Sequence, residues 1–127
     1  MIEDKENRYF HVTPAKNLDS ILKNGLEIRT GERSLANHES QDAVFLFPSF
    51  SEMENALYNW LGAEFEDEDD LIIFQIDIPK GFPVYRDTDS NGELMYEAYT
   101  YENIPPAYIT AVYDERYELI NEGEEKA

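Results

Sequence analysis

The chain has 127 residues and no cysteine, and its 28 Asp and Glu against 10 Lys and Arg give a formal net charge of −18. This length suits one domain, and 42% hydrophobic residues suffice for a buried core, which excludes a disordered acidic chain. The lack of cysteine excludes a disulfide scaffold, a zinc ribbon, an iron–sulfur site and a thiol nucleophile.

The charge is distributed unevenly along the chain. Through Arg33, six acids and six bases cancel, so the following 94 residues carry the whole charge with 22 acids and four bases. Binding to a phosphate backbone needs clustered cations, and we therefore expect no direct contact with nucleic-acid backbone. Two interpretations of the acids stay open. They keep the protein soluble, or they engage a basic partner or mimic the charge of nucleic acid.

Residues 8–12 (RYFHV) are rich in aromatic and β-branched types, which predicts a first strand. Thr13 and Pro14 then look like the N-cap and the first residue of a helix. Apolar residues recur at i, i+3 and i+4 from Leu18, and Gly25 is typical of a helix end. We therefore expect the strand to pass at Thr13 into a first helix that ends at Gly25.

Residues 27–42 are polar and predict a long loop. Residues 43–47 (AVFLF) are apolar throughout, which predicts a second strand that is buried on both faces.

The second helix has the clearest sequence pattern. Ser49 with Glu52, or Ser51 with Glu54, forms a capping box, and Gly62 is typical of a helix end. One face of this predicted helix is apolar, and it consists of Met53, Ala56, Leu57, Trp60 and Leu61.

Six acids in the seven residues 64–70 repel one another and predict a solvated loop. Residues 71–78 predict a strand in which Gln75 and Asp77 alternate with apolar neighbours. The Pro-Lys-Gly sequence at 79–81 predicts a turn.

Residues 94–101 and 108–113 also alternate as strands, and the polar tail at 121–127 is expected to be frayed, which leaves an ordered core of about 8–120. No apolar run approaches the roughly 18 residues that would span a bilayer, and residues 1–7 do not resemble a signal peptide. We expect a soluble, cytoplasmic α+β protein, one domain over 1–127, with mostly antiparallel strands and no contact with membranes.

Residues 87–92 (DTDSNG) match the first half of a calcium-binding loop of the EF-hand type. The twelfth position should be a bidentate glutamate but is Ala98, and Glu97 comes one residue too early. An Asn-Gly hairpin turn explains the same residues, and we expect no metal site.

The composition allows a Ser-His-Asp triad, because the chain contains His11 and His38. However, the chain has no G-x-S-x-G sequence, no phosphate-binding glycine loop and no H-E-x-x-H motif. His11 on the first strand and Glu97 on a late strand are the remaining pair of candidate catalytic side chains. Glu97 shares its strand face with Tyr99 and Tyr101, so it lies at an exposed edge or is held there for a function.

Three blocks of the chain, in order, resemble the ADP-ribosyltransferase superfamily. Residues 9–14 (YFHVTP) and 17–26 (NLDSILKNGL) are similar to a strand that bears a histidine, followed by a helix of the form N-L-x-x-I-L-x-x-G-L. Residues 43–47 and the capped helix resemble the second strand and helix of the family. Glu97 and 104–109 (IPPAYI) resemble the block in which a catalytic glutamate begins a strand ahead of an I-P-P-x-Y-I segment.

The resemblance implies a split sandwich of two small, mostly antiparallel sheets with flanking helices and a cleft between them. It also implies NAD as cofactor and a small bacterial or phage-like member of the branch with a His-Tyr-Glu triad. In that branch His11 would bind a ribose hydroxyl of NAD. Glu97 would bind the 2′-hydroxyl of the nicotinamide ribose and stabilise the oxocarbenium-like transition state as nicotinamide leaves.

Phe45 takes the position of the family's tyrosine, where it keeps a ring that can stack on nicotinamide but lacks the hydroxyl. Tyr58 is a candidate for a second ring. Thr13, Arg29 and Arg33 complete the candidate cofactor-binding residues, the arginines as partners of the pyrophosphate.

The leading function implied by the resemblance is mono-ADP-ribosyl transfer from NAD to a macromolecular acceptor, a protein above all. The alternative is a non-catalytic acidic binding or inhibitor protein on the same fold, which engages a basic partner or mimics nucleic acid. A third interpretation keeps the fold but changes the reaction to NAD hydrolysis or 2′-phosphate transfer to NAD.

Overall fold

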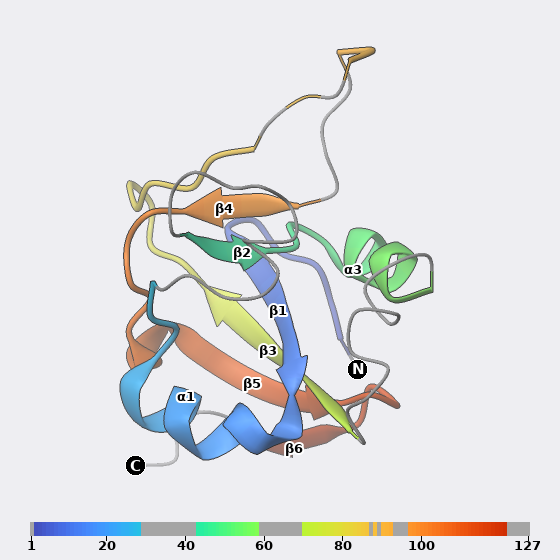
Figure 1. The fold of residues 1–127 in the computed structure, drawn as a ribbon, viewed down its shortest axis with the longest axis vertical. Coiled ribbons are helices and arrows are strands. Elements are labelled where there is room, and N and C mark those ends of the chain that lie inside the picture. Colours follow the sequence, from blue (N-terminus) through green and yellow to red (C-terminus); the bar gives the residue numbers. More distant parts are fainter. Residues whose placement is uncertain are drawn as a thin grey trace.

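Short strands alternate with short helices along the chain. The computed structural model describes residues 2–28, 43–58, 70–86, 88, 90–92 and 97–121. In chain order the elements are β1 (Arg8–Pro14), the 3-10 helix η1 (Ala15–Asn17), α1 (Leu18–Asn24), β2 (Val44–Leu46), α3 (Phe50–Ala56), β3 (Leu71–Asp77), β4 (Ala98–Thr100), the 3-10 helix η3 (Pro106–Tyr108), β5 (Ile109–Asp114) and β6 (Leu119–Asn121) (Figure 1). The described part of the chain is therefore a small α+β domain with two antiparallel sheets and two α-helices, which confirms the fold class at this level.

The larger sheet has four antiparallel strands in the order β1-β3-β5-β6. One of its two inner strands, β3, has the sequence LIIFQID, and residues 72–76 are all buried. A run of β-branched and aromatic residues favours such a strand because each side chain packs against a neighbouring strand or helix.

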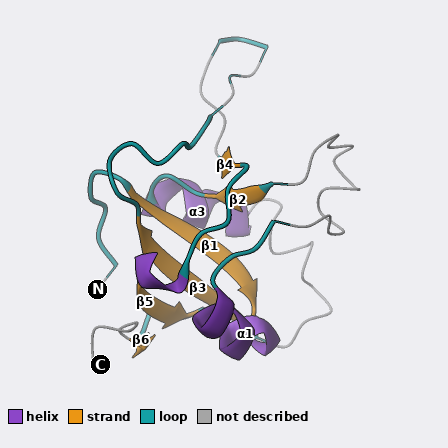
Figure 2. Cartoon of the chain, turned by 90° about the vertical axis from the view of Figure 1, so that its left-hand side faces the viewer, coloured by secondary structure: helices purple, strands orange, loops and turns teal. Residues whose placement is uncertain are grey.

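The two α-helices cover opposite faces of this sheet. Phe74 of β3 belongs to the same hydrophobic cluster as Ile21 of α1. Its neighbour Ile73 points to the other face and belongs to the cluster that contains Met53 of α3. The helices accordingly lie on either side of the strands (Figure 2).

The smaller sheet consists of β2 and β4, with Phe45 opposite Tyr99. Its inner face is buried, because Leu46 and Ala98 are 0% and 1% exposed. Phe45 is only half-buried, so the expectation that residues 43–47 are buried on both faces is wrong for this residue. The two-stranded sheet packs against the core on one face only, which leaves the Phe45 face partly open to solvent.

Gly25 ends α1, as the sequence predicts, with φ +79° and ψ −169°. The chain then forms an isolated bridge between Leu26 and Ile104, with both hydrogen bonds 2.8 Å long. A Cβ atom at Gly25 would lie 2.0 Å from the Ile104 carbonyl oxygen, so only glycine fits here.

The transition from β1 to the first helix differs from the prediction. Strand β1 continues through Pro14, which pairs with Leu71 of β3, and Asn17 rather than Thr13 is the N-cap residue of α1. The Thr13 hydroxyl accepts a hydrogen bond of 2.8 Å from the Asn17 side-chain amide. Pairing with β3 keeps Thr13 and Pro14 extended, and this long-range contact overrides the local signal for a helix start.

Gln75, which alternates with apolar neighbours along β3 as predicted, is only 6% exposed. Its amide nitrogen donates to the Thr110 hydroxyl at 2.9 Å, and its carbonyl oxygen accepts from the Tyr113 hydroxyl at 3.4 Å. The neighbouring strand β5 provides both partners, and they make the burial of this amide tolerable.

The second helix begins as predicted. Ser49 is its N-cap, and the Ser49 hydroxyl accepts from the Glu52 backbone amide at 3.2 Å and donates to the Glu52 carboxylate at 2.8 Å. Met53 and Ala56 are buried, which confirms the apolar face as far as it is described. The remainder of this predicted helix, from residue 59 on, lies outside the described residues.

The C-terminal part contains one more strand than predicted. Residues 119–121 form β6, so Asn121 is paired rather than part of a frayed tail. The predicted strand at 108–113 begins one residue later, because Tyr108 closes η3. Most of the predicted loops at 27–42 and 64–70, residues 93–96 and the tail from 122 lie outside the described residues.

Candidate functional site at the junction of the two sheets

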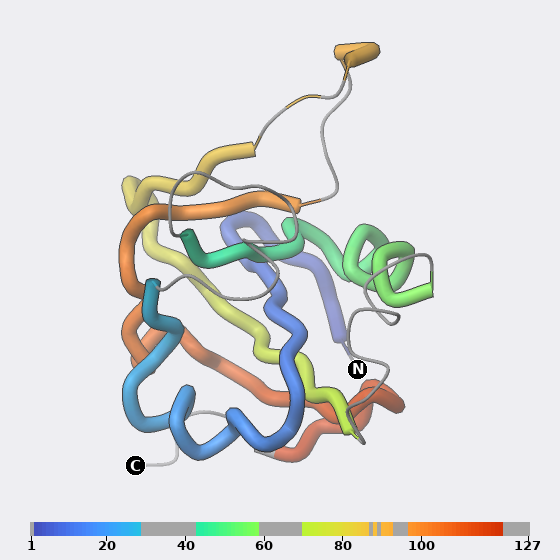
Figure 3. Tube along the Cα trace, viewed as in Figure 1, coloured from blue at the N-terminus to red at the C-terminus, as the bar shows by residue number. Residues whose placement is uncertain are grey.

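Strand β1 joins the two sheets at a single position. Phe10 of β1 and Phe47, which follows β2, exchange two backbone hydrogen bonds of 2.9 and 2.7 Å in an isolated antiparallel bridge. Beyond this bridge β1 runs alongside β3 and away from β2, as Figure 3 shows. We call this region, with His11 and Glu97, the sheet junction.

His11 lies where the two strands separate. In an antiparallel ladder the carbonyl of Phe45 points to the same side as that of Phe47, which is toward β1. The His11 side chain forms a hydrogen bond with this carbonyl, with 2.9 Å between its Nδ1 atom and the Phe45 oxygen. Because a carbonyl oxygen only accepts, Nδ1 carries a proton in this contact, and Nε2 is an acceptor whenever the ring is neutral.

Glu97 is half-buried and directly precedes β4. Continuing the β2–β4 register by one residue sets Glu97 opposite Phe47, which is itself paired with Phe10. The backbones at Glu97 and Phe10 are thus two strand spacings apart, about 10 Å. His11 follows Phe10, so segments from three distant parts of the sequence bring His11, Phe45 and Glu97 to the sheet junction.

The other predicted site residues lie elsewhere or outside the described residues. Thr13 is buried, and its hydroxyl is bonded to Asn17. Tyr58 is 78% exposed at the end of α3 that is remote from β2. Arg29 and Arg33 lie outside the described residues, so their part in binding a pyrophosphate stays a prediction.

The structure adds an aromatic surface that the sequence reveals only in part. Tyr99 lies opposite Phe45 in the small sheet and opposite Tyr85 in an isolated bridge on its other side. Tyr101 contacts both of these tyrosines, and the ring centroids of the contacting pairs are between 5.4 and 6.4 Å apart. We call these four residues, Phe45, Tyr85, Tyr99 and Tyr101, the aromatic face. Strand alternation predicts that Tyr99 and Tyr101 share a face, but nothing local predicts that Tyr85 joins them.

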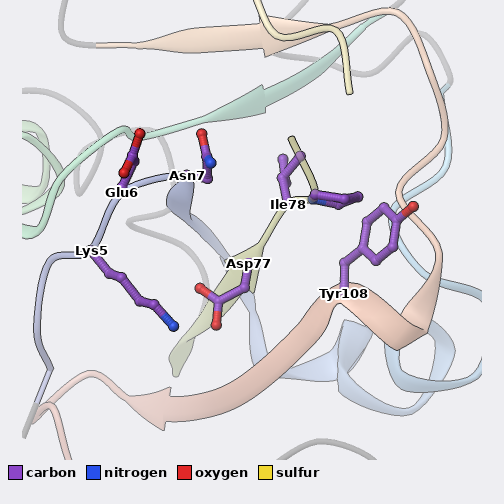
Figure 4. A pocket seen from close by; sticks show the side chains of 7 residues that line it. Lys5, Glu6, Asn7, Asp77, Ile78 and Tyr108 are labelled. Atoms are coloured by element: carbon purple, nitrogen blue, oxygen red, sulfur yellow. The ribbon is translucent and has the colours of Figure 1, made fainter. Parts of the chain in front are cut away.

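Asp77 of β3, the ion-pair partner of Arg8 at the start of β1, lines a pocket of about 420 Å³ (Figure 4). Arg8 binds both carboxylate oxygens of Asp77, at 2.7 and 3.0 Å. Burial alone would raise the pKa of Asp77, but hydrogen bonds from Arg8 and Thr110 outweigh it and lower the pKa below that of a free aspartate. Lys5 and Tyr108 also line the pocket, whereas none of the described residues among the predicted catalytic and cofactor-binding residues does.

The described residues contain no group of three or more His, Cys, Asp or Glu side chains that could hold a metal ion. Asp87 and Asp89 of the calcium-loop pattern lie outside those residues, so the expectation of a hairpin turn rather than a metal site there stays a prediction. Among the described helices, none is long and apolar enough to cross a membrane. No family model, curated protein or solved structure matches the chain.

Proposed function

We propose that the protein transfers ADP-ribose from NAD to a macromolecular acceptor at the sheet junction. The observation that carries the proposal is the hydrogen bond between His11 and the Phe45 carbonyl, which fixes the imidazole where the sheets separate. The backbone at Glu97 then lies about two strand spacings, across Phe47, from that of Phe10, which directly precedes His11. One ligand the size of a nucleotide can bridge that interval.

Each residue has a distinct role in this reaction. His11, with Nε2 as acceptor, receives a hydrogen bond from a ribose hydroxyl and orients the cofactor. The Glu97 carboxylate faces the ribose that bears nicotinamide and stabilises the positive charge that develops on it. Phe45 offers its ring to nicotinamide by stacking and its carbonyl to His11.

The reaction balances without any further reagent. The bond between C1′ of the ribose and the nicotinamide nitrogen breaks, and its electron pair leaves with nicotinamide, which becomes neutral. A lone pair of the acceptor forms the new bond to C1′, and the acceptor's proton passes to Glu97 or to water. When water takes the place of the acceptor, the reaction is NAD hydrolysis.

The test measures nicotinamide release from NAD labelled in the adenylate phosphate, with and without cell lysate, and the transfer of label to protein. The variants are His11→Ala and Glu97→Gln, and Glu118→Gln is the matched control because it removes the same charge from an exposed residue between β5 and β6. Thermal melting checks that each variant is folded.

We expect release that needs lysate, labels protein, and is lost in the first two variants but kept in the control. Nicotinamide release that depends on Glu97 but does not need lysate would show that the reaction is NAD hydrolysis rather than transfer. If the unmodified protein releases no nicotinamide under either condition, or if both variants match it, the proposal is wrong.

A further inference from the structure

The aromatic face is an exposed surface and not an extension of the core. Tyr85 and Tyr101 are 46% and 40% exposed, although both belong to a continuous group of rings. On the opposite side of the same small sheet, Leu46 and Thr100 are fully buried. The small sheet therefore buries the face that carries Leu46 and Thr100 and turns the aromatic face toward solvent.

Grouped exposed rings are typical of binding surfaces. Single exposed apolar residues are ordinary, but a contiguous apolar patch on a soluble protein usually marks a place where something binds. Tyrosine suits such a surface because its ring provides contact area at small entropic cost and its hydroxyl tolerates water.

The charge around the aromatic face selects a cationic ligand. The chain carries −18 overall, and the described residues between 86 and 102 contain two acids and one base. The base, Arg86, forms an ion pair with Glu52 of α3. Glu97 and Glu102 precede and follow β4, the strand at the centre of the aromatic face.

We propose that the aromatic face binds an arginine-bearing segment of a basic protein partner. A guanidinium group that lies over a tyrosine ring within about 6 Å is attracted by the ring's π electrons and also stacks on it as a flat group. Neighbouring rings about one side-chain width apart can accept successive arginines, and the surrounding acids attract the segment from a distance.

This inference goes beyond the proposed transfer, since it concerns binding in the absence of NAD. If transfer also occurs, the aromatic face would hold the acceptor beside Glu97, which directly precedes β4 and lies two residues before Tyr99.

Charge disfavours two other occupants of the aromatic face. Nucleic-acid bases stack well on tyrosine, but their phosphates would meet a chain of net charge −18. A second copy of the chain would bring the same negative charge against it.

The experiment measures binding of a fluorescein-labelled peptide of alternating arginine and glycine by fluorescence anisotropy, without NAD, at low and at physiological salt. A peptide with lysine in place of arginine is measured in parallel. The double variant Tyr85→Leu with Tyr101→Leu removes the two most exposed rings of the face, and Tyr101→Leu alone is measured in case the double variant unfolds. The control is Tyr58→Leu, because Tyr58 is a more exposed tyrosine remote from β2.

We expect the arginine peptide to bind more tightly than the lysine peptide, and both to weaken with salt. Affinity for the arginine peptide should fall about two- to fivefold in Tyr101→Leu and about five- to thirtyfold in the double variant. The Tyr58→Leu control should bind like the unmodified protein. Equal loss in this control, equal affinity for both peptides, or no binding would overturn the proposal. So would self-association that disappears in the double variant, because a second copy would then be the occupant.

Discussion

Gly25 connects α1 to the bridge between Leu26 and Ile104, and its replacement by alanine should have a large effect for two separate reasons. Its backbone angles of φ +79° and ψ −169° belong to a region that is essentially restricted to glycine. Alanine in that region costs about 1–3 kcal/mol. The second reason is steric, because the new methyl group would lie 2.0 Å from the Ile104 carbonyl oxygen and 3.0 Å from backbone atoms of Pro105.

Relief of this clash requires the Ile104 segment to move away from Leu26. That movement disrupts the two backbone hydrogen bonds of 2.8 Å in the bridge. Each is worth roughly 0.5–1.5 kcal/mol. Together with the conformational cost, Gly25→Ala should lower the free energy of unfolding by about 2–6 kcal/mol. That is a large fraction of the roughly 5–15 kcal/mol typical of a folded domain.

The assay is urea unfolding followed by circular dichroism, with Gly81→Ala as the matched control. Gly81 also has a positive φ of +96°, but nothing lies within 4 Å of a Cβ atom added there. The control should therefore lose only the conformational part, roughly 1–2 kcal/mol. If the two variants lose the same stability, the close approach of Ile104 to Gly25 does not contribute, and the reasoning is refuted.

Two further predictions concern polar groups that are held by hydrogen bonds. Thr100 is fully buried, and its hydroxyl donates to the backbone carbonyl of Pro83 at 2.6 Å. Thr100→Val should therefore lower the free energy of unfolding by about 1–3 kcal/mol, and an unchanged urea midpoint would contradict this. Folding lowers the pKa of Asp77, so its ion pair with Arg8 stabilises the fold above the unfolded-state pKa, and this stabilisation is lost as the pH falls through the lower folded-state pKa. Asp77→Asn should be less stable at neutral pH and should lose less stability than the unmodified protein between about pH 4 and pH 2 in urea titrations. Parallel pH profiles for the two proteins would refute this assignment.

Local sequence signals predicted the elements whose cause is local. The capping box at Ser49, the stop at Gly25 and the apolar run of β3 each describe a property of a few consecutive residues, and each is found in the structure. The elements that the sequence did not predict correctly depend on partners distant in sequence. Pro14 remains in a strand because it pairs with Leu71, which lies 57 positions later.

In the candidate site, too, only the features with a local cause could be predicted from the sequence. The sequence predicts that His11 lies on a strand, and it does. The orientation of its ring could not be predicted, because the acceptor is a backbone carbonyl 34 positions away, and every residue has such a carbonyl. The aromatic face was missed for a similar reason, since the bridge between Tyr85 and Tyr99 depends on the path of the intervening chain.

The single bridge between Phe10 and Phe47 also bears on how the molecule moves. Strands β2 and β4 are three residues long each, whereas β1 and β3 pair over seven positions. Amide hydrogens of the small sheet should therefore exchange with solvent through a local opening of lower free energy than those of β3. The aromatic face belongs to this less protected unit. A ligand that binds it would close the opening by mass action, and slower exchange at β2 and β4 would report the binding without any change in the larger sheet.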